Sequence, residues 1–321
     1  MINNFWGRRA VNVELTYKCS LMCPACPRQT QFKARNEKIK GEELSIENFT
    51  KLAKFFNYME FCGQFSDPLH HSKFHEILDI TNRHDIREVS IHTAVSLPPI
   101  EFYREAWKIR PDATWVFGID GMPEDSNKYR VNQDGQKLFD IMLECAKVAT
   151  APPVWQYIIF SYNEKDIAKA QEIADKNNLR LKLIKTSRWD GYYKKDENDY
   201  KPNNDNALPA SGREKGWKSK KLIPDCFGHL PFGTNRYGRL LPCCKVDDIG
   251  NYGDSMYYEM LEASKISDYD SIEDMLNTDV WKKFFENLKN NKGMNRCHDM
   301  CSCDSNPNMI IKEKGKGEEI V

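Results

Sequence analysis

The sequence predicts an α/β protein made of a partial (β/α)6 barrel, over residues 1–190, and a smaller C-terminal domain of a β-hairpin plus a helix, over residues 223–321. From about residue 10 to residue 187, short β-branched or aromatic runs alternate with amphipathic segments of helical period, which is typical of repeated strand–helix units. A polar stretch rich in Asn, Asp, Lys and Gly then ends the repeat. We therefore place a linker or surface loop at residues 191–222.

The repeat contains six strand candidates and five helix candidates. The strands are expected at residues 11–17, 58–63, 88–92, 114–119, 154–160 and 180–186. The helices are expected to begin near Ser45, Lys73, Pro98, Asp134 and Glu164. Six parallel strands form a curved sheet short of the eight of a closed barrel, and in such sheets reactive groups gather at the C-terminal strand ends.

The C-terminal part has a different pattern. Short strands are expected around the segment "HLPFGTNRYGRLLPCCKV", followed by a helix over about residues 271–290. The last segment, "IIKEKGKGEEIV", is expected to be a frayed tail.

The charge balance and hydropathy of the sequence narrow the classes of function that this chain can have. Lysine plus arginine and aspartate plus glutamate both number 47, so no overall basic field favours nucleic acid as a partner. No stretch approaches the ~20 apolar residues that span a bilayer, and the N-terminus lacks the apolar run of a secretory signal. We expect a cytoplasmic protein without a membrane partner.

Eleven cysteines are the most informative feature of the composition. The cytoplasm keeps thiols reduced, so clustered cysteines there favour metal binding over disulfides. Nine of them fall into three groups, at positions 19 to 26, 226 to 244 and 297 to 303. Cys62 and Cys145 stand alone and are expected to be small buried hydrophobic residues. The distribution predicts two metal sites.

The segment "YKCSLMCPACPRQT" places Cys19, Cys23 and Cys26 at the spacing C-x3-C-x2-C directly after the first strand. A structural zinc site needs a fourth ligand, which His70 or His71 could supply. A [4Fe–4S] cluster held by only three thiolates instead leaves one iron open to a substrate or cofactor. The position at the C-terminal rim of the barrel favours the open cluster.

This cysteine spacing, followed by a strand–helix repeat, resembles the radical S-adenosylmethionine (SAM) superfamily, whose fold is a TIM-like barrel. The resemblance implies a site-open [4Fe–4S] cluster on Cys19, Cys23 and Cys26, whose free iron chelates the amino and carboxylate groups of the methionine moiety. It also implies reductive cleavage of SAM to a 5′-deoxyadenosyl radical, which abstracts hydrogen from an organic substrate. The residue before the last cysteine is commonly aromatic in that family and is Ala25 here, where a backbone contact to the cofactor is still expected.

The segment "FCGQFSDPLHH" after the second strand resembles the Gly-Gly-Glu-Pro or Gly-Asp-Pro motif of the same superfamily. In that motif, backbone carbonyls and an acid receive the methionine ammonium. The resemblance therefore assigns the acid to Asp67 and the backbone contacts to Phe65 and Ser66.

The segment "WVFGIDGMPEDSNKYR" resembles the fourth-strand motif Ser-Ile-Asp-Gly with a downstream Tyr-Arg. By this resemblance Arg130 pairs with the methionine carboxylate, which suits the geometry of a guanidinium group, and Gly118 replaces the common serine. Thr93 after the third strand and Asn163 after the fifth are further expected cofactor contacts at the rim.

In the C-terminal part, Cys226, Gly238 and Cys243 follow the pattern C-x11-G-x4-C. This resembles the opening of the SPASM or twitch domain, an auxiliary iron–sulfur domain of many radical SAM enzymes. A hairpin with a glycine turn would bring the two thiols together at its base.

The later segment "RCHDMCSCD" adds Cys297 and Cys301, with Cys303 as the alternative last ligand. Only six cysteines lie beyond residue 225, so one twitch-type [4Fe–4S] cluster accounts for them better than two. A structural zinc ribbon is the alternative, since four thiolates also suit tetrahedral zinc.

The resemblance as a whole implies a radical SAM oxidoreductase or modifying enzyme with SAM and two [4Fe–4S] clusters as cofactors. A second cluster with every iron held by a thiolate would relay electrons instead of binding substrate. The substrate class stays open between a small molecule and a peptide, and an external electron donor such as flavodoxin or ferredoxin is implied.

Two alternatives remain. The first is a zinc-stabilised nucleic-acid- or protein-binding module with "KYR", "KKD" and "REKGWKSKK" as its contact patches. The second is an RNA-modifying enzyme with the same radical chemistry, which needs a basic groove that the balanced charge does not indicate.

Overall fold

The computed structural model describes residues 9–29, 41–186, 200–203, 205–206, 222, 224, 226, 232–235, 237–246, 253–301 and 310–314. Its centre is a nine-stranded sheet in the order β8-β7-β1-β2-β3-β4-β5-β6-β9. The repeat supplies β1 (Ala10–Asn12), β2 (Tyr58–Phe61), β3 (Glu88–Thr93), β4 (Thr114–Gly118), β5 (Val154–Ile158) and β6 (Arg180–Ile184). Neighbours among these six strands all pair in parallel, so the predicted partial (β/α)6 barrel is confirmed.

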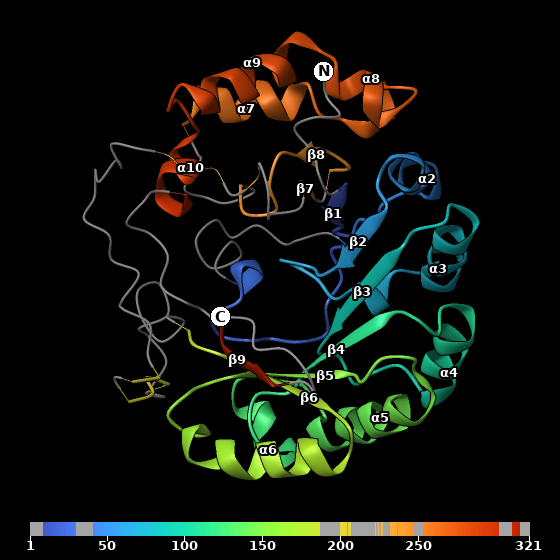
Figure 1. The fold of residues 1–321 in the computed structure, drawn as a ribbon, viewed down its shortest axis with the longest axis vertical. Helices are drawn as coiled ribbons and strands as arrows, with labels where there is room; N and C mark the ends of the chain where they lie inside the picture. The colour runs from blue at the N-terminus through green and yellow to red at the C-terminus, as the bar shows by residue number, and fades with distance from the viewer. Residues whose placement is uncertain are drawn as a thin grey trace.

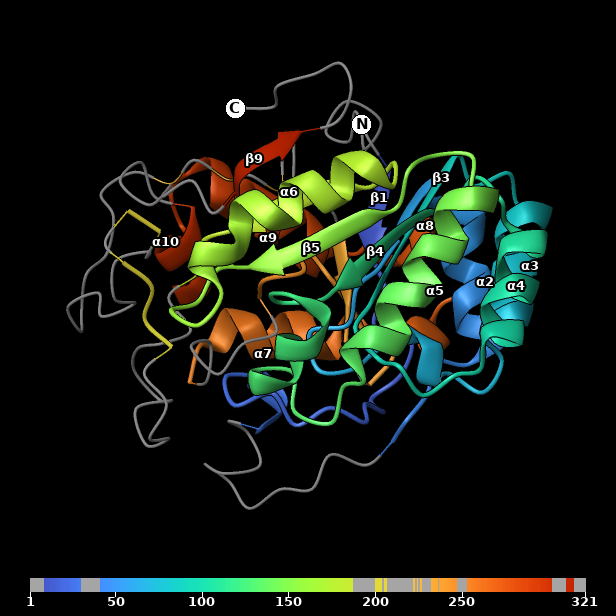
Figure 2. The ribbon, with the colours of Figure 1, turned by 90° about the horizontal axis from the view of Figure 1, so that it is seen from below.

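The helices of the repeat lie on the outer side of the curved sheet (Figures 1 and 2). They are α2 (Ile46–Phe55), α3 (Phe74–Arg83), α4 (Ile100–Ile109), α5 (Gly135–Val148) and α6 (Ile167–Lys176), with the 3-10 segments η2 (Pro68–His70), η3 (Pro123–Lys128) and η4 (Glu164–Asp166). The predicted N-cap Ser45 accepts a hydrogen bond from the Asn48 amide at 3.2 Å. The bounds above show that all five helices begin close to their predicted positions.

The two faces of the sheet differ in polarity because side chains alternate along a strand. Toward the helices the sheet presents large apolar rings, such as Trp115 against Tyr103 of α4 and Trp155 against Phe139 of α5. The alternate positions on the inner face include Glu60 and other polar side chains (Asn12, Ser90, His92). The inner face of the barrel is thus a polar surface on which chemistry can take place.

The predicted C-terminal hairpin is present as β7 (Phe232–Thr234) and β8 (Leu240–Leu241), which pair antiparallel. Gly238, in the connection, has φ +65°, a left-handed conformation that favours glycine. The hairpin also extends the barrel sheet, because β7 pairs in parallel with β1 and Val11 stands opposite Phe232. Because β8 runs antiparallel to β7, the residues that follow β8 lie at the opposite end of the strands from the residues that follow β1.

The helical part of the C-terminal region differs from the prediction. It contains α7 (Ser255–Glu262), which was not expected, η8 (Ile266–Asp268), α8 (Ile272–Leu276), α9 (Asp279–Lys289) and α10 (Asn295–Met300). The single helix expected over residues 271–290 is two helices separated at Asn277 and Thr278, residue types that compete with the backbone for hydrogen bonds. In Figure 1 helices α7, α8 and α9 gather at the β8 end of the sheet.

The expected frayed tail is wrong for its first five residues. Ile310–Lys314 form β9, which pairs antiparallel with β6. An edge strand such as β6 presents unpaired amide and carbonyl groups, and β9 satisfies them. Most of the predicted linker at 191–222 lies outside the described residues.

No helix in the described ranges combines the length and the apolar character needed to cross a membrane.

Candidate active site

The first cysteine loop, residues 18–26, follows the first strand and is fixed from two sides. From the β2 side, Lys18 O accepts from the Asp67 amide at 3.1 Å, and the Ser20 amide donates to His70 Nε2 at 3.2 Å. From the β4 side, the Met22 amide donates to Val131 O at 3.0 Å. These contacts hold the loop across the C-terminal ends of the strands, where the sequence placed it.

The three thiols of this loop lie close enough to act on one another. Burial, then the charge of Asp67 and those of Cys23 and Cys26, raise the pKa of Cys19 to about 12. Burial alone raises the pKa of the solitary Cys145 to about 12 as well, so the informative feature of Cys19 is its thiol neighbours. Soft thiolate donors grouped in this way fit an iron–sulfur cluster, whose positive charge would hold them deprotonated.

The histidines that could complete a zinc site are already engaged. His70 Nε2 accepts from the Ser20 amide, and His71 Nε2 lies 3.0 Å from Leu44 O. The other ring nitrogen of His71, Nδ1, accepts from the Lys73 amide at 3.0 Å. His71 is therefore a buried structural residue, and His70 acts as a support of the cysteine loop.

Asp67 is buried with its carboxylate surrounded by donors. It accepts from the Leu69 amide at 3.2 Å, from Thr93 Oγ1 at 3.0 Å and from the Ala94 amide at 2.8 Å. Burial raises the pKa of Asp67 against the lowering effect of these hydrogen bonds. The structure thus uses Asp67 and Thr93 to join the loop after β2 to the end of β3, directly behind the cysteine loop.

The sequence analysis missed Glu14, a buried carboxylate beside the same loop. Glu14 accepts from the Gln64 amide at 2.7 Å and from Ser66 Oγ, and its own amide donates to Thr234 Oγ1 of β7 at 2.9 Å. The alternation of Asn12, Glu14 and Thr16 with apolar residues in "VNVELT" is the signal that could have placed it on the inner face.

Of the other expected cofactor contacts on this side, Ala25 and Phe65 are buried. The Phe65 ring stacks on Tyr17 at a centroid distance of 5.6 Å. Ser66 is held through its hydroxyl by Glu14.

Arg130 lies at the end of β4 in an ion pair with Asp120. Its Nε donates to Asp120 Oδ2 at 2.7 Å, and Asp120 is fully buried. Burial alone would lower the pKa of Arg130, but the charge of Asp120, followed by that of Cys23, raises it above its usual value. In the part of the chain that the structure describes, only Nε of Arg130 has a hydrogen-bond partner, so Nη1 and Nη2 can receive a carboxylate.

Gly118 makes room for this guanidinium group. A Cβ atom at position 118 would lie 3.1 Å from Arg130 Nη2 and 3.2 Å from Ala94 Cβ. A side chain at position 118, such as the serine of the motif that this segment resembles, would therefore crowd Arg130.

Asn163 has both ends of its amide in use within its own loop. Oδ1 accepts from the Phe160 amide at 2.8 Å, and Nδ2 donates to Ile158 O at 3.0 Å. No hydrogen bond joins Asn163 to the cysteine loop among the residues described. This arrangement gives Asn163 a structural role in the β5 loop.

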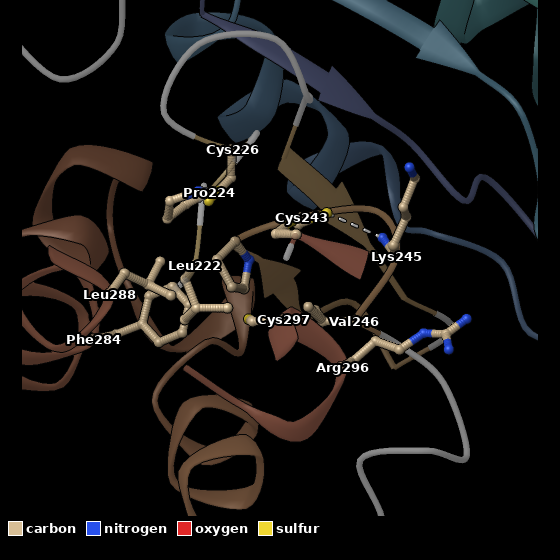
Figure 3. Close-up of a pocket in the computed structure, with 12 residues that line it drawn as sticks. Leu222, Pro224, Cys226, Cys243, Lys245, Val246, Phe284, Leu288, Arg296 and Cys297 are labelled. Atoms are coloured by element: carbon tan, nitrogen blue, oxygen red, sulfur yellow. Dashed lines mark hydrogen bonds between the residues drawn. The ribbon is translucent and has the colours of Figure 1, made fainter. Parts of the chain in front are cut away.

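The second cysteine group lines one pocket. Cys226, Cys243, Cys297 and Cys301 all contribute to its wall, and Figure 3 shows the first three around a common centre. Burial, followed by the charges of Cys243, Cys297 and Cys301, raises the pKa of Cys226. Apolar side chains of Leu222, Val246, Phe284 and Leu288 form much of the remaining wall, to which Lys245 and Arg296 also contribute. A four-thiolate, largely apolar site of this kind fits either a closed iron–sulfur cluster or tetrahedral zinc.

Two close backbone approaches shape this pocket. A Cβ at Gly233 would lie 2.7 Å from the Cα of Cys244, and one at Gly293 would lie 2.7 Å from the Cβ of Cys297. Cys243 and Cys244 stand in a turn after β8, with their thiols hydrogen-bonded to each other. Cys303, the alternative last ligand, lies outside the described residues.

The sequence matches no protein-family model and no curated protein. The fold, by contrast, is similar to that of several solved structures. SuiB from Streptococcus suis, bound to the precursor peptide SuiA, has a TM-score of 0.56 at 11% identity, covering 86% of this chain and 66% of SuiB. SuiB bound to S-adenosylmethionine has a TM-score of 0.51 at 8% identity, covering 91% of this chain and 77% of SuiB.

A further match is BtrN in complex with AdoMet and 2-DOIA, with a TM-score of 0.49 at 12% identity, covering 91% of this chain and 92% of BtrN. The chain has the α/β fold of SuiB, and this is the partial TIM-like barrel that the resemblance to the radical SAM superfamily predicted.

Proposed function

We propose that this chain is a radical SAM enzyme that binds SAM at the C-terminal rim of the barrel and modifies a peptide or small molecule by redox chemistry. The observation that carries the proposal is the gathering of Cys19, Cys23 and Cys26 in one partly buried loop at that rim. The fold of SuiB, which has been solved with S-adenosylmethionine and with a precursor peptide, supports the same function and makes a peptide substrate the first to test.

In this proposal the three thiolates hold a site-open [4Fe–4S] cluster. When bound and reduced, that cluster supplies the electron that cleaves SAM to the 5′-deoxyadenosyl radical. The protein's own part is to bind and orient SAM. Buried, hydrogen-bonded groups suit this role because they are held in one geometry before the cofactor arrives.

The groups at the two sides of the cysteine loop suit the two charges of the methionine moiety. Arg130 offers two guanidinium nitrogens whose direction is set by the Nε–Asp120 contact, so it can bind the carboxylate in a forked arrangement. The backbone carbonyls of Phe65 and Ser66 are proposed to accept hydrogen bonds from the methionine ammonium group. The negative charge of Asp67 would attract the methionine ammonium group. Its carboxylate oxygens meanwhile hold the loop after β2 against the end of β3.

The second site is proposed to hold a closed [4Fe–4S] cluster on Cys226, Cys243, Cys297 and Cys301. A fully ligated cluster has no position for substrate, so its suitable role is electron transfer. Flavodoxin or ferredoxin would be the external donor. This role favours two-electron oxidation or cross-linking of the substrate.

Iron and zinc analysis of anaerobically purified protein tests the proposal. Two [4Fe–4S] clusters give about eight irons per chain. The variant Cys19→Ala/Cys23→Ala/Cys26→Ala should keep about four. Protein that carries zinc in place of iron, and is colourless, would support the zinc-stabilised binding module instead.

One contact patch of the binding-module alternative is poorly suited to its role. The patch "KYR" ends in Arg130, which is mostly buried and paired with Asp120, whereas a phosphate contact needs an exposed cation. The segment "REKGWKSKK" lies outside the described residues, as does "KKD".

A further inference from the structure

The inner face of the barrel carries a third group of metal-ligating side chains, which uses none of the cysteines assigned above. Glu60 lies on β2, Cys62 directly follows that strand, and His92 lies on the neighbouring β3. One ligand atom from each of the three lies within 4.8 Å of the other two. The grouping follows from the fold, because residues two apart on a strand share a face and Glu60 stands opposite Ser90 in the β2–β3 register.

Neighbouring polar groups orient these side chains. Asn12 Nδ2 of β1 donates to Glu60 Oε2 at 2.9 Å, while Glu60 Oε1 lies 3.0 Å from His92 Nε2. Ser90 Oγ lies 3.1 Å from the same ring nitrogen. One carboxylate oxygen is thus anchored, and the other points toward the histidine. The Asn12 contact is an outer partner of the kind that fixes the orientation of a metal ligand.

Cys62 does not behave as the small buried hydrophobic residue that the sequence suggested. It is only half-buried, and the His92 side chain hydrogen-bonds to it. The solitary Cys145, by contrast, is completely buried on α5, in agreement with the prediction. Because Cys62 lies on the polar inner face of the sheet, we expect its thiol to interact with a polar group or an ion.

We propose that Glu60, Cys62 and His92 bind one divalent cation of the zinc class. Carboxylate oxygen, thiolate sulfur and imidazole nitrogen are the three donor types that zinc takes, and three protein ligands with one open position are typical of catalytic zinc. Two anionic ligands offset the charge of the cation. Two cationic side chains, Arg180 and Lys182, line the same cavity as Glu60 and His92, and Lys182 acts electrostatically on Glu60.

The open position would face a cavity of about 330 Å³. Glu60 and His92 line this cavity together with Ser90 and Val116. A cation here is therefore reachable by water or by a polar group of a bound substrate. The three ligands lie on the inner face of the same strands whose C-terminal ends support the cysteine loop, so the cation would lie within the barrel.

The test uses the cluster-loaded holoprotein, incubated with zinc chloride and then freed of loose metal by a chelator. Metal analysis should find about one zinc per chain, and X-ray absorption at the zinc edge should find about one sulfur with nitrogen and oxygen as the other ligands. The variants His92→Gln and Cys62→Ala should each lose this zinc while their iron content stays unchanged. His84→Gln and Cys145→Ala are matched controls that should keep it.

Three results would overturn the proposal: no zinc above the chelated background, a zinc environment of sulfur alone, or zinc retained in both ligand variants. A sulfur-only environment would place the metal in the four-cysteine pocket. Unchanged iron shows that a variant is folded, so loss of zinc with iron intact cannot be ascribed to unfolding. Iron content and SAM cleavage report on the proposed function separately, so the two proposals can fail independently.

Discussion

At the residue scale, the buried ion pair of Arg130 and Asp120 is the feature that most directly prepares the proposed cofactor site. The Asp120 carboxylate accepts from the Ile158 amide at 2.8 Å as well as from Arg130, and the Asp120 carbonyl accepts from the Tyr162 hydroxyl at 2.9 Å. The loops after β4 and β5 are thereby joined around one fixed charge. A guanidinium group held in this way loses little freedom when it binds a carboxylate.

Replacing Arg130 by methionine should destabilise the protein by about 3–5 kcal/mol, because the buried Asp120 charge is left without its partner. The double variant Arg130→Met/Asp120→Asn should recover part of this loss in thermal unfolding. Both variants should lose SAM affinity in a calorimetric titration. Equal unfolding temperatures for the single and double variants would show that the ion pair is not the source of the effect.

Glu43 supports the start of the cysteine loop from outside. It accepts from Lys18 Nζ at 2.8 Å, from the Ser72 amide at 2.8 Å and from Ser72 Oγ at 2.6 Å. Burial would raise the pKa of Glu43, but these hydrogen bonds outweigh it and hold the pKa at about 2, below the ordinary value of 4.5.

A pH dependence follows from this lowered pKa. The stabilisation by Glu43 is present above about 4.5 and is lost as the pH falls toward 2. The difference in unfolding temperature between the native protein and Glu43→Gln should therefore be constant near neutral pH and shrink in acid. Glu47→Gln, on the exposed face of α2, is the control and should show a smaller difference throughout. A Glu43→Gln difference that stays constant down to the lowest pH would contradict the assignment.

At the element scale, Asp254 connects two helices of the second site. As the N-cap of α7 it accepts from the Met256 amide at 3.0 Å, and its other oxygen accepts from the Asn295 amide of α10 at 2.6 Å. Helix α10 carries Cys297, whose pKa burial raises to about 12 with a smaller contribution from Asp254. One side chain thus fixes the position of a proposed ligand helix.

The variant Asp254→Ala should cost about 1–2 kcal/mol through loss of the cap. It should also lower iron retention at the second site, because α10 loses its anchor. Ser45→Ala removes a cap of the same kind on α2 and serves as the control. It should cost about 1 kcal/mol in thermal unfolding without changing the iron content. Equal iron in the two variants would contradict the role of Asp254.

The elements differ in how far the sequence could predict them. Helix starts at Ser45 and Asp134 were predictable because a capping side chain and an apolar face are local signals. The pairing of β7 with β1 and of β9 with β6 was not, since each depends on an open sheet edge far away in the chain. Helix α7 was missed, and so was the break at Asn277 and Thr278, where the Thr278 hydroxyl donates to Met275 O at 2.9 Å.

At the scale of the whole molecule, the two proposed cluster sites follow nearby strands of one sheet but lie at opposite ends of those strands. Cys19 follows β1, Cys243 follows β8, and only β7 separates these strands in the sheet order. In the proposed function, an open cluster for chemistry would lie at one end of these strands and a closed cluster for electron transfer at the other. This arrangement suits a substrate that reacts at one site and releases an electron to the other.

The candidate site shows the same division between local and distant signals. Cysteine spacing predicted both thiol groups, and the four predicted auxiliary ligands do line one pocket. Glu14 and the Glu60–Cys62–His92 group were missed because their grouping appears only when strands are laid side by side. The sequence assigned Asn163 to the cofactor, but its amide is committed to its own loop.

The most direct test of the central claim is formation of 5′-deoxyadenosine from SAM by the anaerobic, dithionite-reduced protein. The native protein and the Cys145→Ala control should form it, and Cys23→Ala should not. Formation of 5′-deoxyadenosine by Cys23→Ala at the native rate would contradict the assignment of the first cysteine loop.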